Sequence, residues 1–231
     1  MEAIFQRPIG TMLFDLDGTL VNIPSIWSFF DEILVQTLTE FNITIPSEAI
    51  RLGLWHSGGE FELVLRSWGV KEYDSFIAHF DEIDYKKRQE FIAKGIIRLF
   101  DDVDVLESLH ERVPLGLLTN TPPEIAILEL KMFNLERFFK GLVMLGTEEQ
   151  EFAKPEPDGF LRLLDKFEVS PENAVMVGDS SSDIIGGNRV GMITVLIKRP
   201  DQAAPTDLDP PPDLTITNLN DLLKFQLSGT G

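Results

Sequence analysis

The chain alternates short apolar runs with segments in which apolar residues recur at helical spacing. The apolar runs are continuous rather than alternating, which is typical of strands buried on both faces of a parallel sheet. They lie at Met12–Asp17, Leu115–Asn120, Gly141–Gly146, Ala174–Asp179 and Ile193–Lys198, with a weaker run at Leu214–Thr217. Because helical patterns separate these runs, the sequence predicts an α/β fold with a parallel sheet and helices on both faces.

The helical patterns between the runs are short. They lie at Val103–Glu111, Glu124–Phe133, Pro157–Phe167, Ser182–Val190 and Leu219–Phe225. The acidic Asp102-Val103-Asp104 segment favours the start of a helix, where acidic residues complement the helix dipole. Residues Arg199–Asp213 are rich in Pro and Asp, and we interpret them as a surface loop.

One stretch, from Val21 to about Gly95, breaks the alternation and shows no clear strand. Its large apolar residues recur at helical spacing, for example at Ile26, Phe29 and Ile33. Loops of this length are rarely structureless. We therefore expect a helical domain, residues 21–95, inserted into a core made of residues 1–20 and 96–231.

Composition narrows the class of protein. The 231 residues include 38 acidic and 20 basic ones, and the formal charge of −18 disfavours nucleic acid and anionic membranes as partners. The absence of cysteine excludes disulfides and thiolate chemistry. No apolar run approaches the roughly 20 residues that span a bilayer, and the first ten residues do not resemble a secretory signal. These features predict a cytoplasmic protein.

Polar residues with chemical potential follow the predicted strands at their carboxyl ends, where α/β sheets bind ligands. They are Asp15 and Asp17 after the first strand, Thr119 and Asn120 at the second, Lys154 in the connection after the third, and Asp179 and Asp183 after the fourth. Each group alone is more typical of an ordinary turn or helix cap. Their occurrence together, in this order, is not expected of four unrelated turns.

Carboxylates that converge without a His or Cys partner favour a hard cation with oxygen ligands. Mg²⁺ fits best, because it accepts a few carboxylates and keeps waters and a substrate phosphate. A carboxylate attacks a phosphoryl group poorly unless the charge of that group is neutralised, and Mg²⁺ with Lys154 would do so. The expected ligand is therefore a phosphorylated compound.

These residues resemble the four motifs of the haloacid dehalogenase-like hydrolase superfamily, over nearly the whole chain. The matching segments are Asp15-Leu16-Asp17-Gly18-Thr19-Leu20, Leu117-Leu118-Thr119-Asn120, Lys154-Pro155-Glu156-Pro157-Asp158-Gly159-Phe160 and Gly178-Asp179-Ser180-Ser181-Ser182-Asp183. The resemblance implies a Rossmann-like core, and it implies that the helical insert is a cap that closes over the site. It also implies Mg²⁺-dependent phosphoryl transfer through an aspartyl-phosphate.

Carried over to this chain, the resemblance makes Asp15 the nucleophile and Asp17 the general acid and base. Thr119 and Lys154 would hold the phosphoryl group, with Asn120 as a helper. Asp15, Asp179 and the backbone carbonyl of Asp17 would ligate Mg²⁺. Asp183 would support the metal directly or through water.

The carboxylate at Asp17 favours phosphate esters, because an alkoxide leaving group needs a proton donor. Within the superfamily, we interpret the chain as a phosphatase of a small phosphorylated metabolite, of the phosphoglycolate phosphatase-like type. A phosphosugar mutase of the β-phosphoglucomutase type shares these residues, and a non-enzymatic binding protein on the same fold is a further alternative. The sequence does not indicate the substrate or the oligomeric state.

Two residues of the insert are candidate specificity residues. His56 lies in the segment Trp55-His56-Ser57-Gly58-Gly59, which could reach the substrate or could simply end a helix. Arg66 could bind a substrate anion, although a solvated helix face is the alternative.

Overall fold

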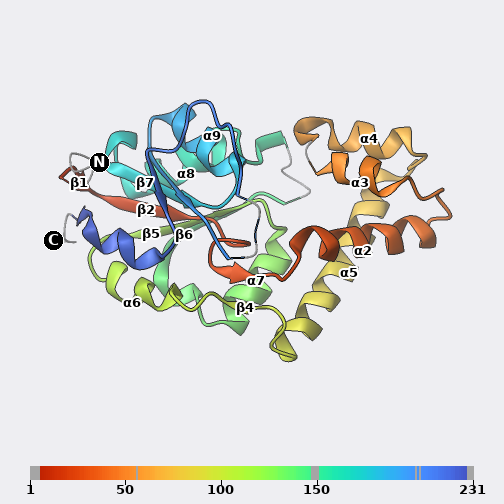
Figure 1. The fold of residues 1–231 in the computed structure, drawn as a ribbon, viewed down its shortest axis with the longest axis horizontal. Coiled ribbons are helices and arrows are strands. Elements are labelled where there is room, and N and C mark those ends of the chain that lie inside the picture. The colour runs from red at the N-terminus through yellow and green to blue at the C-terminus, as the bar shows by residue number, and fades with distance from the viewer. Residues whose placement is uncertain (1–5, 56, 147–150, 201, 203, 228–231) are drawn as a thin grey trace. The chain divides into compact units, whose positions relative to one another are not determined.

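The computed structural model describes residues 6–55, 57–146, 151–200, 202 and 204–227. The chain divides into two compact units (Figure 1). One, here called the core unit, comprises residues 1–22 and 98–231, and the other, here called the helical unit, comprises residues 23–97. Among the described residues, no helix combines the length and apolar character needed to cross a membrane.

The core unit is built around a parallel sheet of six strands. Across the sheet the order is β6 (Phe139–Met144), β5 (Leu115–Thr119), β2 (Thr11–Phe14), β7 (Ala174–Gly178), β8 (Ile193–Ile197) and β9 (Leu214–Ile216). Every residue of the four strands β2, β5, β7 and β8 is buried. Burial on both faces explains why these strands are continuous apolar runs in the sequence.

Two short pairs of strands flank this sheet. Strand β1 (Pro8–Ile9) runs parallel to β10 (Gln226–Leu227). Strand β3 (Val21–Asn22) pairs antiparallel with β4 (Arg98–Leu99), so the segments that lead out to the helical unit and back form a small ribbon.

The helices of the core unit lie on both faces of the sheet. The connection from β5 to β6 and that from β6 to β7 run in opposite directions, so right-handed crossovers place their helices on opposite faces. Figure 1 shows α8 and α9 on one side and α6 and α7 on the other. These helices are α6 (Leu106–Leu109), α7 (Pro123–Met132), α8 (Asp158–Phe167) and α9 (Ser181–Val190), and the 3₁₀ turns are η2 (Val103–Val105), η3 (Glu136–Phe138), η5 (Pro171–Asn173) and η6 (Leu219–Lys224).

Helices α8 and α9 pack against the sheet with apolar side chains. Phe160, with no exposed surface, belongs to a buried cluster with Leu13, Leu118 and Met176. A β-carbon at Gly186 of α9 would collide with the Phe160 ring. Phe160 therefore fixes how closely α8 and α9 approach, and it anchors the loop that carries Lys154.

The helical unit has its own apolar core. Its elements are α2 (Ile26–Glu40), α3 (Glu48–Leu54), η1 (Gly58–Glu60), α4 (Phe61–Ser67) and α5 (Tyr73–Ala93). Leu38, Leu54, Leu65 and Phe76 are fully buried together. The helical spacing at Ile26–Phe41, Phe61–Trp68 and Phe76–Phe91 indicated α2, α4 and α5, whereas α3 gave no such signal.

The α/β architecture predicted from the apolar runs is confirmed, since all six runs form strands of one parallel sheet. The interpretation of residues Arg199–Asp213 as a surface loop is wrong at its first residue. Arg199 is only 6% exposed, because its guanidinium binds the buried Asp102. Asp102 does precede the 3₁₀ helix η2, but its side chain binds Arg199 rather than capping that helix.

Candidate active site

Seven of the predicted site residues meet at the carboxyl edge of the central strands. Asp15 and Asp17 follow β2, Thr119 ends β5 and Asp179 follows β7, and these three strands are neighbours. Strand β2 is also the point at which the chain changes direction across the sheet, with β5 on one side and β7 on the other. Such switch points are where open α/β sheets bind ligands.

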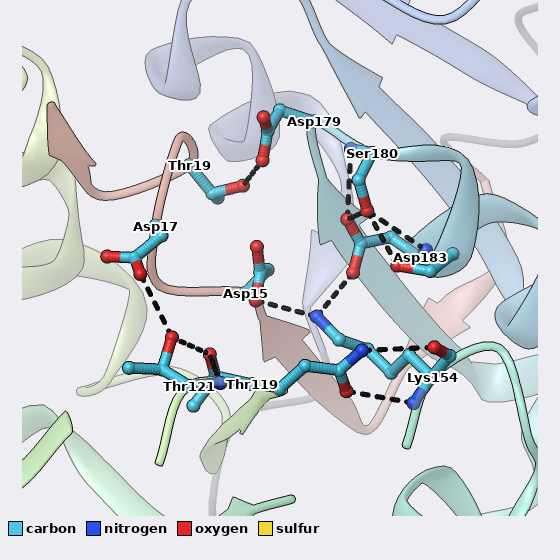
Figure 2. A network of polar contacts seen from close by, with 11 residues as sticks. Asp15, Asp17, Thr19, Thr119, Thr121, Lys154, Asp179, Ser180 and Asp183 are labelled. Atoms are coloured by element: carbon cyan, nitrogen blue, oxygen red, sulfur yellow. Dashed lines mark hydrogen bonds and ion pairs between the residues drawn. The ribbon is translucent and has the colours of Figure 1, made fainter. Parts of the chain in front are cut away.

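Lys154 joins two carboxylates of this edge. Its ammonium lies 2.6 Å from Asp15 Oδ1 and 2.6 Å from Asp183 Oδ1 (Figure 2). The Lys154 side chain is 2% exposed, and those of Asp15 and Asp183 are 10% and 0% exposed. Charge-assisted bonds this short, away from water, hold the nucleophile candidate and the lysine in fixed register.

Asp183 is fixed by the start of helix α9. Ser180 forms a capping box with it: the Ser180 backbone N–H donates to Asp183 Oδ2, and the Asp183 N–H faces Ser180 Oγ. The Ser180 hydroxyl also donates to Asp183 Oδ2 at 2.5 Å. Both oxygens of Asp183 are therefore bound by the protein, one by Lys154 and one by Ser180. A β-carbon at Gly178 would collide with Asp183, which explains the glycine there.

Asp179 is held by the loop that follows Asp17. The Thr19 hydroxyl donates to Asp179 Oδ1 at 2.9 Å. Gly18 has a φ of +79° and lies so close to Asp179 that a β-carbon would collide with its carboxylate. Glycine satisfies both requirements, and this explains the Asp-Gly-Thr order of the motif.

Asp17 is oriented by a residue that the sequence reasoning missed. The Thr121 hydroxyl donates to Asp17 Oδ2 at 3.0 Å, and the Thr119 hydroxyl donates to Thr121 Oγ1 at 2.9 Å (Figure 2). Thr121 is 8% exposed and Thr119 is 1% exposed. Thr121 directly follows Thr119-Asn120 in the sequence, but a bond to Asp17 across 104 positions leaves no local signal.

The side-chain amide of Asn120 binds the backbone of Lys154. Its Oδ1 accepts from the Lys154 backbone N–H at 2.8 Å, and its Nδ2 donates to the Lys154 carbonyl at 3.0 Å. This pair of bonds fixes the backbone of the lysine-bearing loop to the end of β5. Asn120 therefore acts on the site through the position of Lys154.

Burial of these charged groups next to one another shifts their pKa values. Burial, together with the charges of Asp183 and Asp17, raises the pKa of Asp15 to about 7 in spite of Lys154. Burial and the neighbouring Asp15 raise the pKa of Asp179 well above its ordinary value. Burial alone would lower the pKa of Lys154, but Asp15 and Asp183 raise it overall. The negative charge of these carboxylates is thus disfavoured in the buried site in spite of the lysine.

The arrangement fits a hard divalent cation. Carboxylate oxygens of Asp15, Asp179 and Asp183 lie within 4.8 Å of one another. This set offers only oxygen atoms, which Mg²⁺ prefers, and a cation would offset both the burial and the mutual repulsion that raise the carboxylate pKa values. Because both oxygens of Asp183 are already bound, Asp15 and Asp179 have the freer oxygens in this set.

The two candidate specificity residues lie in the helical unit. His56 lies outside the described residues. Arg66, on α4, is paired with Glu62 and donates to the Lys71 carbonyl at 3.1 Å, and its side chain is 46% exposed. Its role in substrate binding stays a prediction.

Similarity to known proteins identifies the family of this chain. The family model described as haloacid dehalogenase-like hydrolase matches residues 9–191. The chain therefore belongs to the haloacid dehalogenase-like hydrolase family, and it is an enzyme. Pyrophosphatase PpaX of Anoxybacillus flavithermus is 30% identical over 94% of this chain and 96% of its own length. The family resemblance predicted from the four motifs is confirmed.

Solved structures show the same fold. A predicted phosphoglycolate phosphatase from Haemophilus somnus is 24% identical, with a TM-score of 0.71 over 94% of this chain and 97% of its own. The hydrolase YfnB from Bacillus subtilis, solved bound to magnesium and described as showing interdomain movement, is 20% identical. Its TM-score is 0.63, over 94% of this chain and 97% of its own.

Proposed function

We propose that this chain hydrolyses small phosphomonoesters through a covalent phosphoryl group on Asp15. The observation that carries the proposal is the buried contact of Asp15 with Lys154, 2.6 Å apart and shared with Asp183. A lysine so placed would neutralise a bound phosphoryl group while it leaves the second oxygen of Asp15 facing the site. The family match and the phosphatase names of the relatives support the reaction class.

The residues divide the reaction between them. An Asp15 oxygen attacks phosphorus and the ester P–O bond breaks, with Asp17 giving its proton to the leaving oxygen. Asp17 then takes a proton from water, which attacks the aspartyl-phosphate, releases phosphate and restores Asp15. Thr119 would turn its hydroxyl hydrogen from Thr121 to a phosphoryl oxygen, and Asn120 keeps Lys154 in place.

Mg²⁺ would be held by Asp15, Asp179 and the backbone carbonyl of Asp17, with Asp183 as its support. When bound, it supplies positive charge that draws a phosphate toward a carboxylate-rich site and stabilises the charge of the transferring group. The acidic cluster supports this assignment. The surplus of carboxylates over lysine in the site is otherwise hard to reconcile with a phosphate ligand.

We further propose that the helical unit is a cap that restricts the substrate to small molecules. Its connections to the core unit, β3 and β4, begin and end close in sequence to the Asp15–Thr19 loop and to Asp102. A closed cap would exclude water and strengthen the contacts of the phosphoryl group with Lys154. His56 and Arg66 are the candidate residues of this unit for substrate selection.

The test is a screen of phosphate compounds with Mg²⁺, scored by phosphate release. It includes a three-carbon phosphate ester, a hexose phosphate, an aryl phosphate and a folded phosphoprotein. We expect the small esters to be hydrolysed and the phosphoprotein to be nearly inert. Equal kcat/KM values for the phosphoprotein and the three-carbon ester would reject the cap role, and no phosphate release from any ester would reject the proposed function.

Inorganic pyrophosphate is a second candidate substrate, favoured by the similarity to pyrophosphatase PpaX over nearly the whole chain. Its leaving group is itself a phosphate, which needs less help from a proton donor than an alkoxide does. Asp17→Asn should therefore retain more activity on pyrophosphate than on an alkyl phosphate. The hexose phosphate also separates hydrolysis from the mutase alternative, because a mutase would form an isomer without releasing phosphate.

A further inference from the structure

A buried ion pair lies outside the family motifs, between Arg199 after β8 and Asp102 after β4. Arg199 Nη1 lies 2.9 and 2.7 Å from the two carboxylate oxygens of Asp102. The side chains are 2% and 8% exposed. A bond of this kind, in the absence of solvent, imposes a defined geometry on both partners.

The pair is completed by three further contacts. The Leu219 backbone N–H donates to Asp102 Oδ2 at 2.7 Å, and the Arg199 guanidinium lies 4.0 Å from the centre of the Phe100 ring. Arg199 Nη2 donates to the carbonyl of Thr19. The arginine therefore connects the strand that returns from the helical unit with the loop that follows Asp15 and Asp17.

The contact at Thr19 reaches the proposed metal site by one more step. Arg199 donates to the backbone carbonyl of Thr19, and the side-chain hydroxyl of Thr19 donates to Asp179 Oδ1 at 2.9 Å. The next residue is held as well, since the Phe100 N–H donates to the Leu20 carbonyl at 3.1 Å. Thr19 cannot shift without disturbing either the buried guanidinium or Asp179.

We propose that Arg199, fixed by Asp102, is a positioning residue for the Asp15–Leu20 loop and, through Thr19, for the Asp179 carboxylate. The proposal rests on the proposed function and adds to it a residue that no motif contains. A lysine at position 199 keeps the charge but cannot bind Asp102 and the Thr19 carbonyl with the same planar group. Arg199→Lys is therefore the sharpest variant, because it separates charge from geometry.

The helical unit provides a matched control. Arg51 Nε and Nη2 donate to the two oxygens of Asp31 at 2.6 and 2.7 Å, and Nη1 donates to the Pro46 carbonyl at 2.6 Å. Like Arg199, Arg51 thus joins a carboxylate to a backbone carbonyl, and its side chain is 11% exposed. None of its three bonds reaches Asp15, Thr19 or Asp179.

The experiment compares Arg199→Lys and Asp102→Asn with Arg51→Lys in the full chain. Two quantities are measured: kcat on an aryl phosphate, and the Mg²⁺ concentration that half-saturates the Mg²⁺-induced rise in melting temperature. Both core variants should lower kcat on the order of tenfold to a hundredfold, as expected for misplaced reacting groups. Both should also weaken Mg²⁺ binding several-fold, whereas Arg51→Lys should lower the melting temperature and leave both quantities unchanged.

The results separate a positioning role from a purely structural one. If Arg199→Lys lowers the melting temperature but keeps the wild-type kcat and Mg²⁺ half-saturation, Arg199 is structural and the proposal is wrong. If Arg199→Lys is too unstable to purify, Asp102→Asn decides by the same two readouts. If the wild-type chain releases no phosphate from any ester, the proposed function fails, but the Mg²⁺-induced melting shift still shows whether Arg199 positions Asp179.

Discussion

The buried charges of the helical unit and those of the candidate active site are arranged in opposite ways. In the helical unit, Arg88 donates to Asp84 Oδ1 at 2.8 Å across one turn of α5, and both side chains are almost fully buried. In the core unit, the carboxylates of Asp15, Asp179 and Asp183 surround one lysine. The first arrangement pairs opposite charges, whereas the second gathers like charges away from water.

The difference indicates which arrangement serves a ligand. A buried carboxylate and guanidinium in contact compensate each other, so such a pair is compatible with a purely structural role. Burial, with a smaller contribution from the neighbouring carboxylates, raises the pKa values of Asp15 and Asp179, which is a cost to the folded chain. A cation bound at the proposed metal site would offset this cost, and perturbed groups of this kind are typical of functional sites.

The largest effect is expected from removing the nucleophile. Asp15→Asn should lower phosphate release by roughly 10⁴-fold or more, the scale seen when a nucleophile is deleted. It should also leave no phosphoenzyme detectable after acid quench with labelled substrate. Asp84→Asn, the change of the same type in the helical unit, should leave a measurable phosphoenzyme.

A second variant tests the division of roles within the loop. Asp17→Asn keeps the proposed nucleophile Asp15 but removes the proposed proton donor and acceptor. With an aryl phosphate, whose leaving group needs little protonation, this variant should accumulate phosphoenzyme. Stable phosphoenzyme on Asp15→Asn would show that another residue is the nucleophile.

In the absence of metal, replacing a buried carboxylate by an amide should change the melting temperature in opposite directions in the two units. Asp179→Asn removes a like charge beside Asp15 and keeps an oxygen for the Thr19 bond, so it should raise the melting temperature in chelator by a few degrees, or about 1 kcal/mol. Asp84→Asn removes a negative charge that compensates a buried arginine and should destabilise by about 3 kcal/mol. Both are measured by thermal unfolding with excess chelator.

Adding Mg²⁺ should make the wild-type chain melt at a higher temperature than Asp179→Asn, the reverse of the order expected in chelator. The wild-type chain should gain melting temperature and activity, whereas Asp179→Asn should gain little of either. Ca²⁺ should restore activity poorly, because it favours more ligands and looser geometry. Full activity of the wild-type chain in excess chelator would contradict the metal assignment.

Much of the core unit could be predicted because four of its strands, β2, β5, β7 and β8, are buried on both faces and form continuous apolar runs. Three of these strands end at or directly before a candidate site residue, such as Asp15 after β2 or Thr119 in β5. Helix α3 gave no such signal, because it is short and Leu54 is its only buried residue in the described chain. Contacts between residues that lie far apart in the sequence could not be predicted either. Arg199 was interpreted as part of a surface loop, because its partners Asp102 and Thr19 lie 97 and 180 positions away.

A smaller effect should come from Thr121, whose contact with Asp17 could not be read from the sequence. Thr121→Val removes the hydroxyl but keeps the shape, so Asp17 should lose its orientation. One hydrogen bond to a charged group corresponds to roughly tenfold to a hundredfold in rate. The loss in kcat should be larger for an alkyl phosphate than for an aryl phosphate, and Thr121→Ser should restore most of it. Equal losses on both substrates would mean that Thr121 does not act through Asp17.

The smallest effect distinguishes two helix starts, one in each unit. Ser180 caps α9 with its side chain and binds Asp183, whereas Ser47 begins α3 without a capping hydrogen bond from its side chain. Ser180→Ala should lower the free energy of unfolding by about 1 kcal/mol, and Ser47→Ala by only a few tenths. Ser180→Ala should also lower kcat modestly, because Asp183 would lose the bond that fixes its oxygen opposite Lys154. Chemical denaturation and aryl phosphate kinetics on both variants measure the two effects. If both alanine variants lose the same stability and keep wild-type kcat, the capping box of α9 is an ordinary helix start and does not position Asp183.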